Sequence, residues 1–191
     1  AKGLTMRTAP LDRPMEITGP LTAKLFISSE TEDADIFVVV HVFDPDGKEV
    51  LFHGANEPRA PIAQSWLRAS HRKLDPEKSL PWMPVHPHTE AEPLSPGKIY
   101  ELDIEIWPTS IHVPAGYRIA LSVRGKDYEY GGGSGGKLSN FKNELTGCGP
   151  FLHDKPEDRP PALSNGTTTL HFGKGKMPYV LLPVIPPKKK R

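Results

Sequence analysis

The chain has 191 residues, 37% of them hydrophobic and 25% charged, and its formal net charge at pH 7 is +1. This length suits one domain, and a near-neutral charge gives no reason to expect binding to nucleic acid or to an anionic membrane. The single cysteine, Cys148, excludes an internal disulfide and a multi-cysteine zinc site. The 22 prolines and 17 glycines require frequent turns, because proline fits neither helix interiors nor central strands.

The first half of the chain predicts short strands joined by turns. Alternating apolar residues predict a strand over 22–28, and the β-branched run 34–43 predicts a strand buried on both faces. The sequence Asp44-Pro45-Asp46-Gly47 predicts a tight turn, and residues 48–53 then form the returning strand of a hairpin. Residues 64–71 predict the next strand, in which Trp66 is expected to lie in the core.

The second half continues in the same manner after a long irregular loop. Prolines throughout 74–96 exclude regular structure there. Residues 98–107 then predict a strand that places Trp107 in the core and ends at Pro108. Further strands are predicted over 117–123, 167–172 and 179–182, with a turn at 114–116. The best window for a helix is 138–145, which is only about two turns long.

This pattern predicts an all-β domain over residues 1–187, in which two antiparallel sheets pack as a sandwich. Long crossing loops favour jelly-roll topology of the galactose-binding-like kind. Residues 188–191, all basic, are expected to be a solvated tail. Because no apolar run could span a membrane and residues 1–7 do not read as a signal peptide, a cytoplasmic location is favoured. The chain does not begin with methionine, which fits a domain cut from a longer protein.

The sequence contains one apparent nucleophile motif. Ser134 lies in a G-x-S-x-G match, and Asp154 and His171 follow in the chain order of α/β-hydrolases. A run of glycines cannot hold a strained serine rigidly, and no βαβ pattern surrounds it. We therefore predict no catalytic residue, and no enzymatic activity for this chain alone.

Two binding hypotheses remain as alternatives. His86, His88 and Glu92 have an H-x-H-x3-E spacing that suits a cupin-like metal site, although the prolines around them favour an ordinary loop. The alternative is a carbohydrate-binding module, in which Trp82, Tyr128 and Tyr130 stand in loops as stacking platforms. No cofactor is predicted.

Two further features carry weaker signals. His41 lies in the most apolar strand and is predicted to be a hydrogen-bonded core or edge histidine. The loop that contains His153, Asp154 and Arg159 is predicted to be a self-paired charged surface loop, and the alternative is a docking surface for another domain.

Several short stretches, in order and spacing, resemble a known family. They are Ile17-Thr18-Gly19-Pro20, Asp33-Ala34-Asp35, Asp44-Pro45-Asp46-Gly47, residues 67–72, 94–100 and 108–110, Gly116-Tyr117-Arg118-Ile119, and residues 182–186. Together they resemble the C-terminal non-catalytic domain of Xaa-Pro dipeptidyl-peptidases and cocaine-esterase-like (CocE/NonD) serine hydrolases. Tyr117 and the glycine run 131–136 depart from the commoner pattern.

The resemblance implies a function for the domain. In that family the catalytic residues lie in an α/β-hydrolase domain, which would be the partner here, and the jelly roll packs on it and helps to form the substrate entrance. The parents cleave esters or amides. Trp82, Tyr128, Tyr130, His153, Asp154 and Arg159 are the candidate interface residues, and a homo-oligomer is left open.

Overall fold

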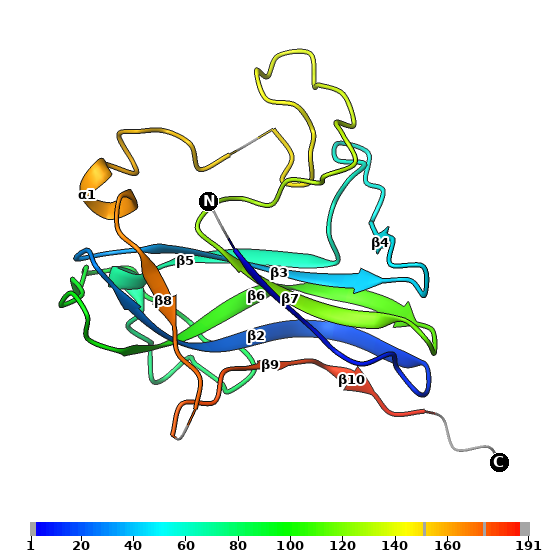
Figure 1. Cartoon of the computed structure of the whole chain (residues 1–191), viewed down its shortest axis with the longest axis horizontal. Helices are drawn as coiled ribbons and strands as arrows, with labels where there is room; N and C mark the ends of the chain where they lie inside the picture. The colour runs from blue at the N-terminus through cyan, green and yellow to red at the C-terminus, as the bar shows by residue number, and fades with distance from the viewer. Residues whose placement is uncertain (1–2, 151, 174, 188–191) are drawn as a thin grey trace.

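The computed structural model describes residues 3–150, 152–173 and 175–187, so the predicted basic tail lies outside the described residues. Two antiparallel sheets pack face to face (Figure 1). Sheet A contains β1 (Leu4–Arg7), β7 (Arg118–Arg124), β3 (Asp35–Phe43), β4 (Glu49–Val50) and β5 (Ala63–Arg68). Sheet B contains β2 (Met15–Ser29), β6 (Tyr100–Val113), β8 (Thr168–Leu170), β9 (Tyr179–Leu181) and β10 (Val184–Ile185). The predicted all-β class and two-sheet antiparallel sandwich are confirmed.

In sheet A, β3 lies at the centre, with β7 and then β1 on one side and with β4 and β5 on the other. In sheet B, β2 pairs with β6 along most of its length, while β8, β9 and β10 pair with its other edge. The edge strands β5 and β6 therefore lie on the same side of the sandwich, and Thr109 on β6 donates a hydrogen bond to the carbonyl of Ile62, next to β5.

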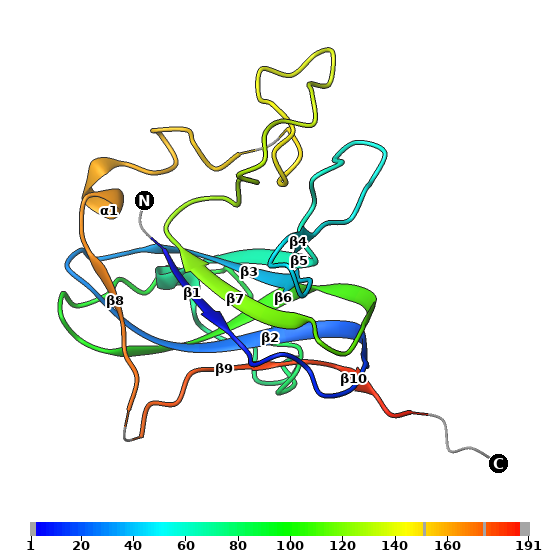
Figure 2. The ribbon, with the colours of Figure 1, turned by 45° about the vertical axis from the view of Figure 1, so that its right-hand side comes forward.

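The core forms between the sheets because side chains alternate along each strand. Its most deeply buried members are Ile17, Leu21 and Leu25 from β2, Val38 and Val42 from β3, and Leu102, Ile104 and Ile106 from β6. All seven inner residues of β3 are buried on both faces, as predicted. The second face is covered by the segment that follows β7, which rises above sheet A in Figure 2.

Both strand tryptophans are on the outside, so their predicted core positions were wrong. On β5 the buried positions are Ala63, Ser65 and Leu67, which puts Trp66 on the opposite face. On β6 the same alternation buries Ile106 and exposes Trp107. The prediction assigned each tryptophan by its size, whereas the period of two decides which face it occupies.

Pro108 does not end its strand, contrary to prediction. β6 continues to Val113, and the register with β2 shifts between Gly19 and Leu21. Gly19 pairs with Thr109 and Leu21 with Ile106, so β6 carries one extra residue in a β-bulge. A proline is tolerated in such a bulge, where no ladder hydrogen bond is required.

Other element predictions were partly right. Strands β8 and β9 lie within the ranges predicted for them, and the turns at Gly47 and Gly116 have positive φ. The predicted return strand 48–53 is reduced to the two residues of β4. The window 138–145 forms turns, not a helix, and in the described ranges the helical elements are η1 (Ala69–His71) and α1 (Pro161–Ser164). Within the described residues, no helix is long and apolar enough to cross a membrane.

Candidate functional site

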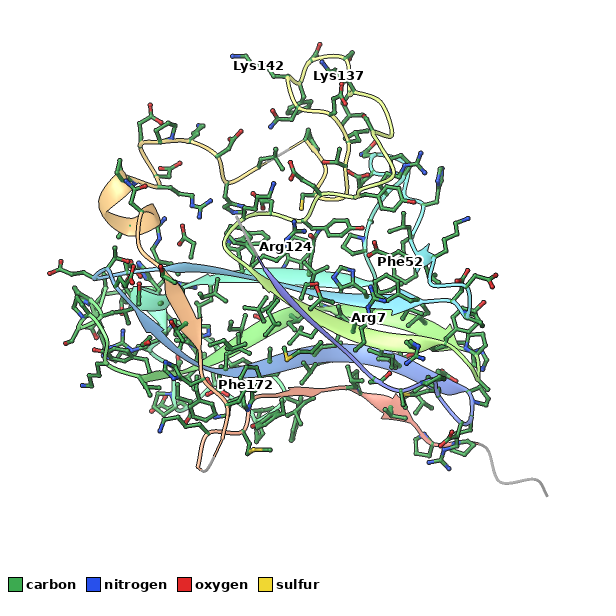
Figure 3. All side chains as sticks on the ribbon, viewed as in Figure 1. Arg7, Phe52, Arg124, Lys137, Lys142 and Phe172 are labelled. Atoms are coloured by element: carbon green, nitrogen blue, oxygen red, sulfur yellow. The ribbon has the colours of Figure 1, made fainter. Side chains whose placement is uncertain are left out.

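A groove of about 680 Å³ opens between β5 and the segment 152–159. Trp66 and Arg68 line it from β5, Asp35 and Phe37 from β3, and His153 from the facing segment. This segment contributes much of the wall although it contains no strand, so contacts with the sheet must hold it in place. The same face carries the loop of residues 131–145, whose tip bears Lys137 and Lys142 (Figure 3).

Four rings form a continuous row, of which Phe37, Trp66 and His153 line the groove and Trp107 lies beside it. His153 lies 5.4 Å from Phe37 and 4.3 Å from Trp66, measured between ring centroids, and Trp66 lies 5.4 Å from Trp107. Phe37 is buried, whereas Trp66 is 41% exposed and Trp107 52% exposed. We call these four residues the aromatic row. It runs from the covered face of sheet A to the outer side of sheet B and leaves two large apolar side chains in contact with water.

Asp35 joins the two walls of the groove. Its carboxylate accepts hydrogen bonds from Arg68 Nε at 2.8 Å and Nη2 at 3.1 Å, and from Arg159 Nε at 2.8 Å. The side chain of Asp35 is largely buried, and hydrogen bonding to it raises the pKa of Arg68. Arg159 also donates to the carbonyl oxygens of His153 and Gly125. The predicted self-paired loop was therefore wrong, because Arg159 pairs with the sheet.

His153 is fixed by a buried carboxylate. Asp127 accepts the backbone N–H of His153 at 2.7 Å and its Nδ1 at 2.8 Å. Asp154 follows directly, is exposed and also lines the groove. His153, Asp154 and Arg159, all predicted interface residues, are thus brought together in one groove.

Trp82, Tyr128 and Tyr130, predicted as a stacking platform for sugars, are not all exposed. Tyr128 is 3% exposed and donates its phenol hydrogen to Glu49 at 2.9 Å. Burial, and next the nearby Glu49 carboxylate, raise the pKa of Tyr128 above its ordinary range. Tyr130 is half-buried beside Arg59, and Trp82 is exposed but does not line the groove. Tyr128 was mispredicted because a loop residue was assumed to face solvent, whereas this loop covers sheet A.

The proposed metal residues have other partners. Both ring nitrogens of His86 lie within hydrogen-bond distance of carbonyl oxygens, those of Lys73 and Asp103. Glu92 forms an ion pair with Arg72 at 3.1 Å. His88 lies in contact with His86 and His71, and its pKa is lowered by burial and by these neighbouring histidines. In the described part of the chain, no group of three or more potential ligands is placed to hold a metal ion.

Ser134, the apparent nucleophile, also has hydrogen-bond partners of its own. Ser134 exchanges hydrogen bonds with the backbone of Gly136, within its own turn, and His171 bonds Ser28 on β2. Ser134 and His171 therefore take separate partners in different parts of the fold.

A Ser-His-Glu network, which the sequence did not reveal, lies under the covering loop. His41 bonds Glu49 through Nδ1 and Ser122 through Nε2, the latter at 2.8 Å, and Ser122 in turn bonds Thr5 at 2.7 Å. Ser122 lies on a central strand between β1 and β3, where neighbouring backbone N–H groups belong to the sheet ladder. Those groups are not available to stabilise an oxyanion, so the network serves to connect strands. His41 is hydrogen-bonded and buried, as predicted.

The fold and the groove define a β-sandwich domain with a partly apolar outer face. The chain matches the model of the X-Pro dipeptidyl-peptidase C-terminal non-catalytic domain over residues 1–180. It belongs to this family, which confirms the resemblance seen in the sequence.

Curated relatives and solved structures agree with this assignment. The chain is 36% identical over 157 residues to proteins of Mycobacterium bovis and Mycobacterium tuberculosis that are assigned by name to the serine esterases. The matched region is 80% of this chain and 22% of each relative, so the chain spans about a fifth of their length.

The fold is shared with a CocE/NonD family hydrolase from Staphylococcus aureus, with a TM-score of 0.78 and 24% identity over 96% of this chain and 30% of that one. It is also shared with an α-amino acid ester hydrolase, with a TM-score of 0.59 and 16% identity over 96% and 25% of the two chains.

Proposed function

We propose that this chain is the accessory domain of a serine hydrolase that acts on esters or on X-Pro peptides. It packs on an α/β-hydrolase domain of the same protein and forms one wall of the substrate entrance. The family to which the chain belongs is described as non-catalytic and C-terminal, and the curated relatives extend well beyond the matched region.

The observation that carries this proposal is the exposure of Trp66 and Trp107 beside the groove. Large aromatic side chains are enriched at protein interfaces, where burying them supplies much of the binding free energy. In this chain the pair stands at the sheet edge, and the groove-forming segment 152–159 is fixed beside it by Asp35. A rigid surface of this kind suits permanent contact with a second domain.

The proposal is tested by mixing the chain with the purified α/β-hydrolase domain of its parent protein. Hydrolysis of p-nitrophenyl acetate and of an Ala-Pro chromogenic amide is measured for each part and for the mixture. We expect the chain alone to be as inactive as its Ser134→Ala variant, and the mixture to form a 1:1 complex with higher activity than the hydrolase domain alone. Turnover by the chain alone that is lost in Ser134→Ala, or the absence of a complex, would overturn the proposal.

A further inference from the structure

Trp66, in the middle of the aromatic row, leaves part of its surface open to another aromatic ring. Trp66 contacts His153 on one side and Trp107 on the other, and 41% of its surface is still exposed. Ring pairs in offset or edge-on contact gain free energy beyond the area that they bury. An occupant of the groove that carries a ring would therefore add a further ring contact to Trp66.

The polar partner that this occupant must supply follows from His153. A carboxylate only accepts hydrogen bonds, so the contact of Nδ1 with Asp127 places a proton on Nδ1. In the neutral ring Nε2 is then an acceptor. Among the described residues no polar atom bonds Nε2, and the side chain lines the groove. For the neutral ring, the missing partner is therefore a hydrogen-bond donor.

The charges of the groove favour a neutral occupant. Its acidic residues, Asp35, Asp154 and Asp158, are matched by the basic residues Arg68, Lys155 and Arg159. Asp35 is bonded to both arginines, so these three charges already compensate one another and call for no net charge on an occupant. Three conditions are thus set for the occupant: an aromatic ring for Trp66, a hydrogen-bond donor for His153, and no net charge. A neutral polypeptide side chain that combines a ring with one donor satisfies them.

We infer that the groove receives an aromatic side chain with a ring-borne hydrogen-bond donor, as in tyrosine, from the hydrolase domain. Its ring lies against Trp66 and its hydroxyl donates to His153 Nε2. This inference rests on the proposed function, because the occupant belongs to the domain on which the chain packs. Asp127 is a positioning residue, since it fixes the tautomer and the orientation of His153.

The test compares two probes that differ in one hydroxyl group, N-acetyl-tyrosinamide and N-acetyl-phenylalaninamide, in an NMR titration of the 191-residue chain. We expect the tyrosine probe to bind about fivefold more tightly, which is the usual value of one neutral hydrogen bond. In His153→Phe, which keeps a ring but no acceptor, the two probes should bind equally. Trp66→Ala should weaken both, and Trp82→Ala, outside the groove, should change neither.

Three results would overturn the inference. They are equal affinity of the two probes for the unchanged chain, binding of neither probe, and tighter binding of methyl β-glucoside than of the tyrosine probe at the same residues. None of these results bears on whether the chain forms a complex with the hydrolase domain. Failure of the mixing experiment, in contrast, removes the proposed function whatever the probes do.

Discussion

Asp35 offers the sharpest test of how the groove is held together. The Asp35→Asn substitution keeps the size of the side chain but removes the charge that Arg68 and Arg159 share. Three hydrogen bonds end on this carboxylate, and bonds to charged groups contribute about 1.5–3 kcal/mol each. Asparagine retains one acceptor oxygen, and both arginines keep some contact with water. The expected loss is therefore about two bonds, or about 3 kcal/mol.

The assay is thermal unfolding followed by circular dichroism. For a domain of this size, 1 kcal/mol lowers Tm by about 2–4 °C, so we expect a decrease of about 6–12 °C. Limited digestion with a glutamate-specific protease should also cleave faster after Glu157, because the segment that carries it loses its main contact with the sheet. Asp46→Asn, in an exposed turn, is the matched control and should change Tm by less than about 2 °C. A similar small change in Asp35→Asn, with unchanged cleavage, would refute the reasoning.

Further predictions concern the core, the covering loop and the thiol. Leu102→Ala should cost about 2–5 kcal/mol of unfolding free energy, whereas Trp107→Ala should cost much less, and equal losses in chemical denaturation would contradict the assigned faces of β6. Tyr128→Phe should destabilise the chain by about 1–2 kcal/mol, because Glu49 loses a buried donor, while Tyr130→Phe serves as a nearly neutral control.

Burial, and next Asp127, raise the pKa of Cys148 to about 12. Its reaction with a thiol reagent at pH 8 should therefore be about a thousandfold slower than that of the unfolded chain. As pH rises, the thiol of the unfolded chain loses its proton before the thiol of the folded chain does. The contribution of Cys148 to the free energy of unfolding should therefore be fully present below about pH 8.5 and decrease as pH rises above that value. Fast labelling of the folded chain would show that Cys148 is accessible.

The strands of the sandwich could be predicted because each carries its own signal. The run 34–43 is too short for a membrane helix and too rich in β-branched residues for an ordinary one, and it forms the central strand. By contrast, β1 and β10 are short edge strands whose pairing depends on distant partners, and residues 4–7 and 184–185 give no such local pattern.

The site was harder to predict than the fold. His153, Asp154 and Arg159 were identified as candidates from their charged loop, but Asp35, Asp127 and Trp66 were not. Trp66 had an available signal, since Leu67 and Ser65 fix which face of β5 is buried. The contact between Asp127 and His153 spans 26 residues of irregular chain, and Arg159 is 124 residues from Asp35. No periodicity in the sequence reports contacts of this kind.

The most direct test of the central claim is amide hydrogen exchange of the chain, alone and bound to the α/β-hydrolase domain of its parent. The account predicts slower exchange in the complex at residues 63–68 and 152–159, which form the walls of the groove, and little change along β9 and β10. Protection confined to β9 and β10, or no protection on mixing, would contradict the account.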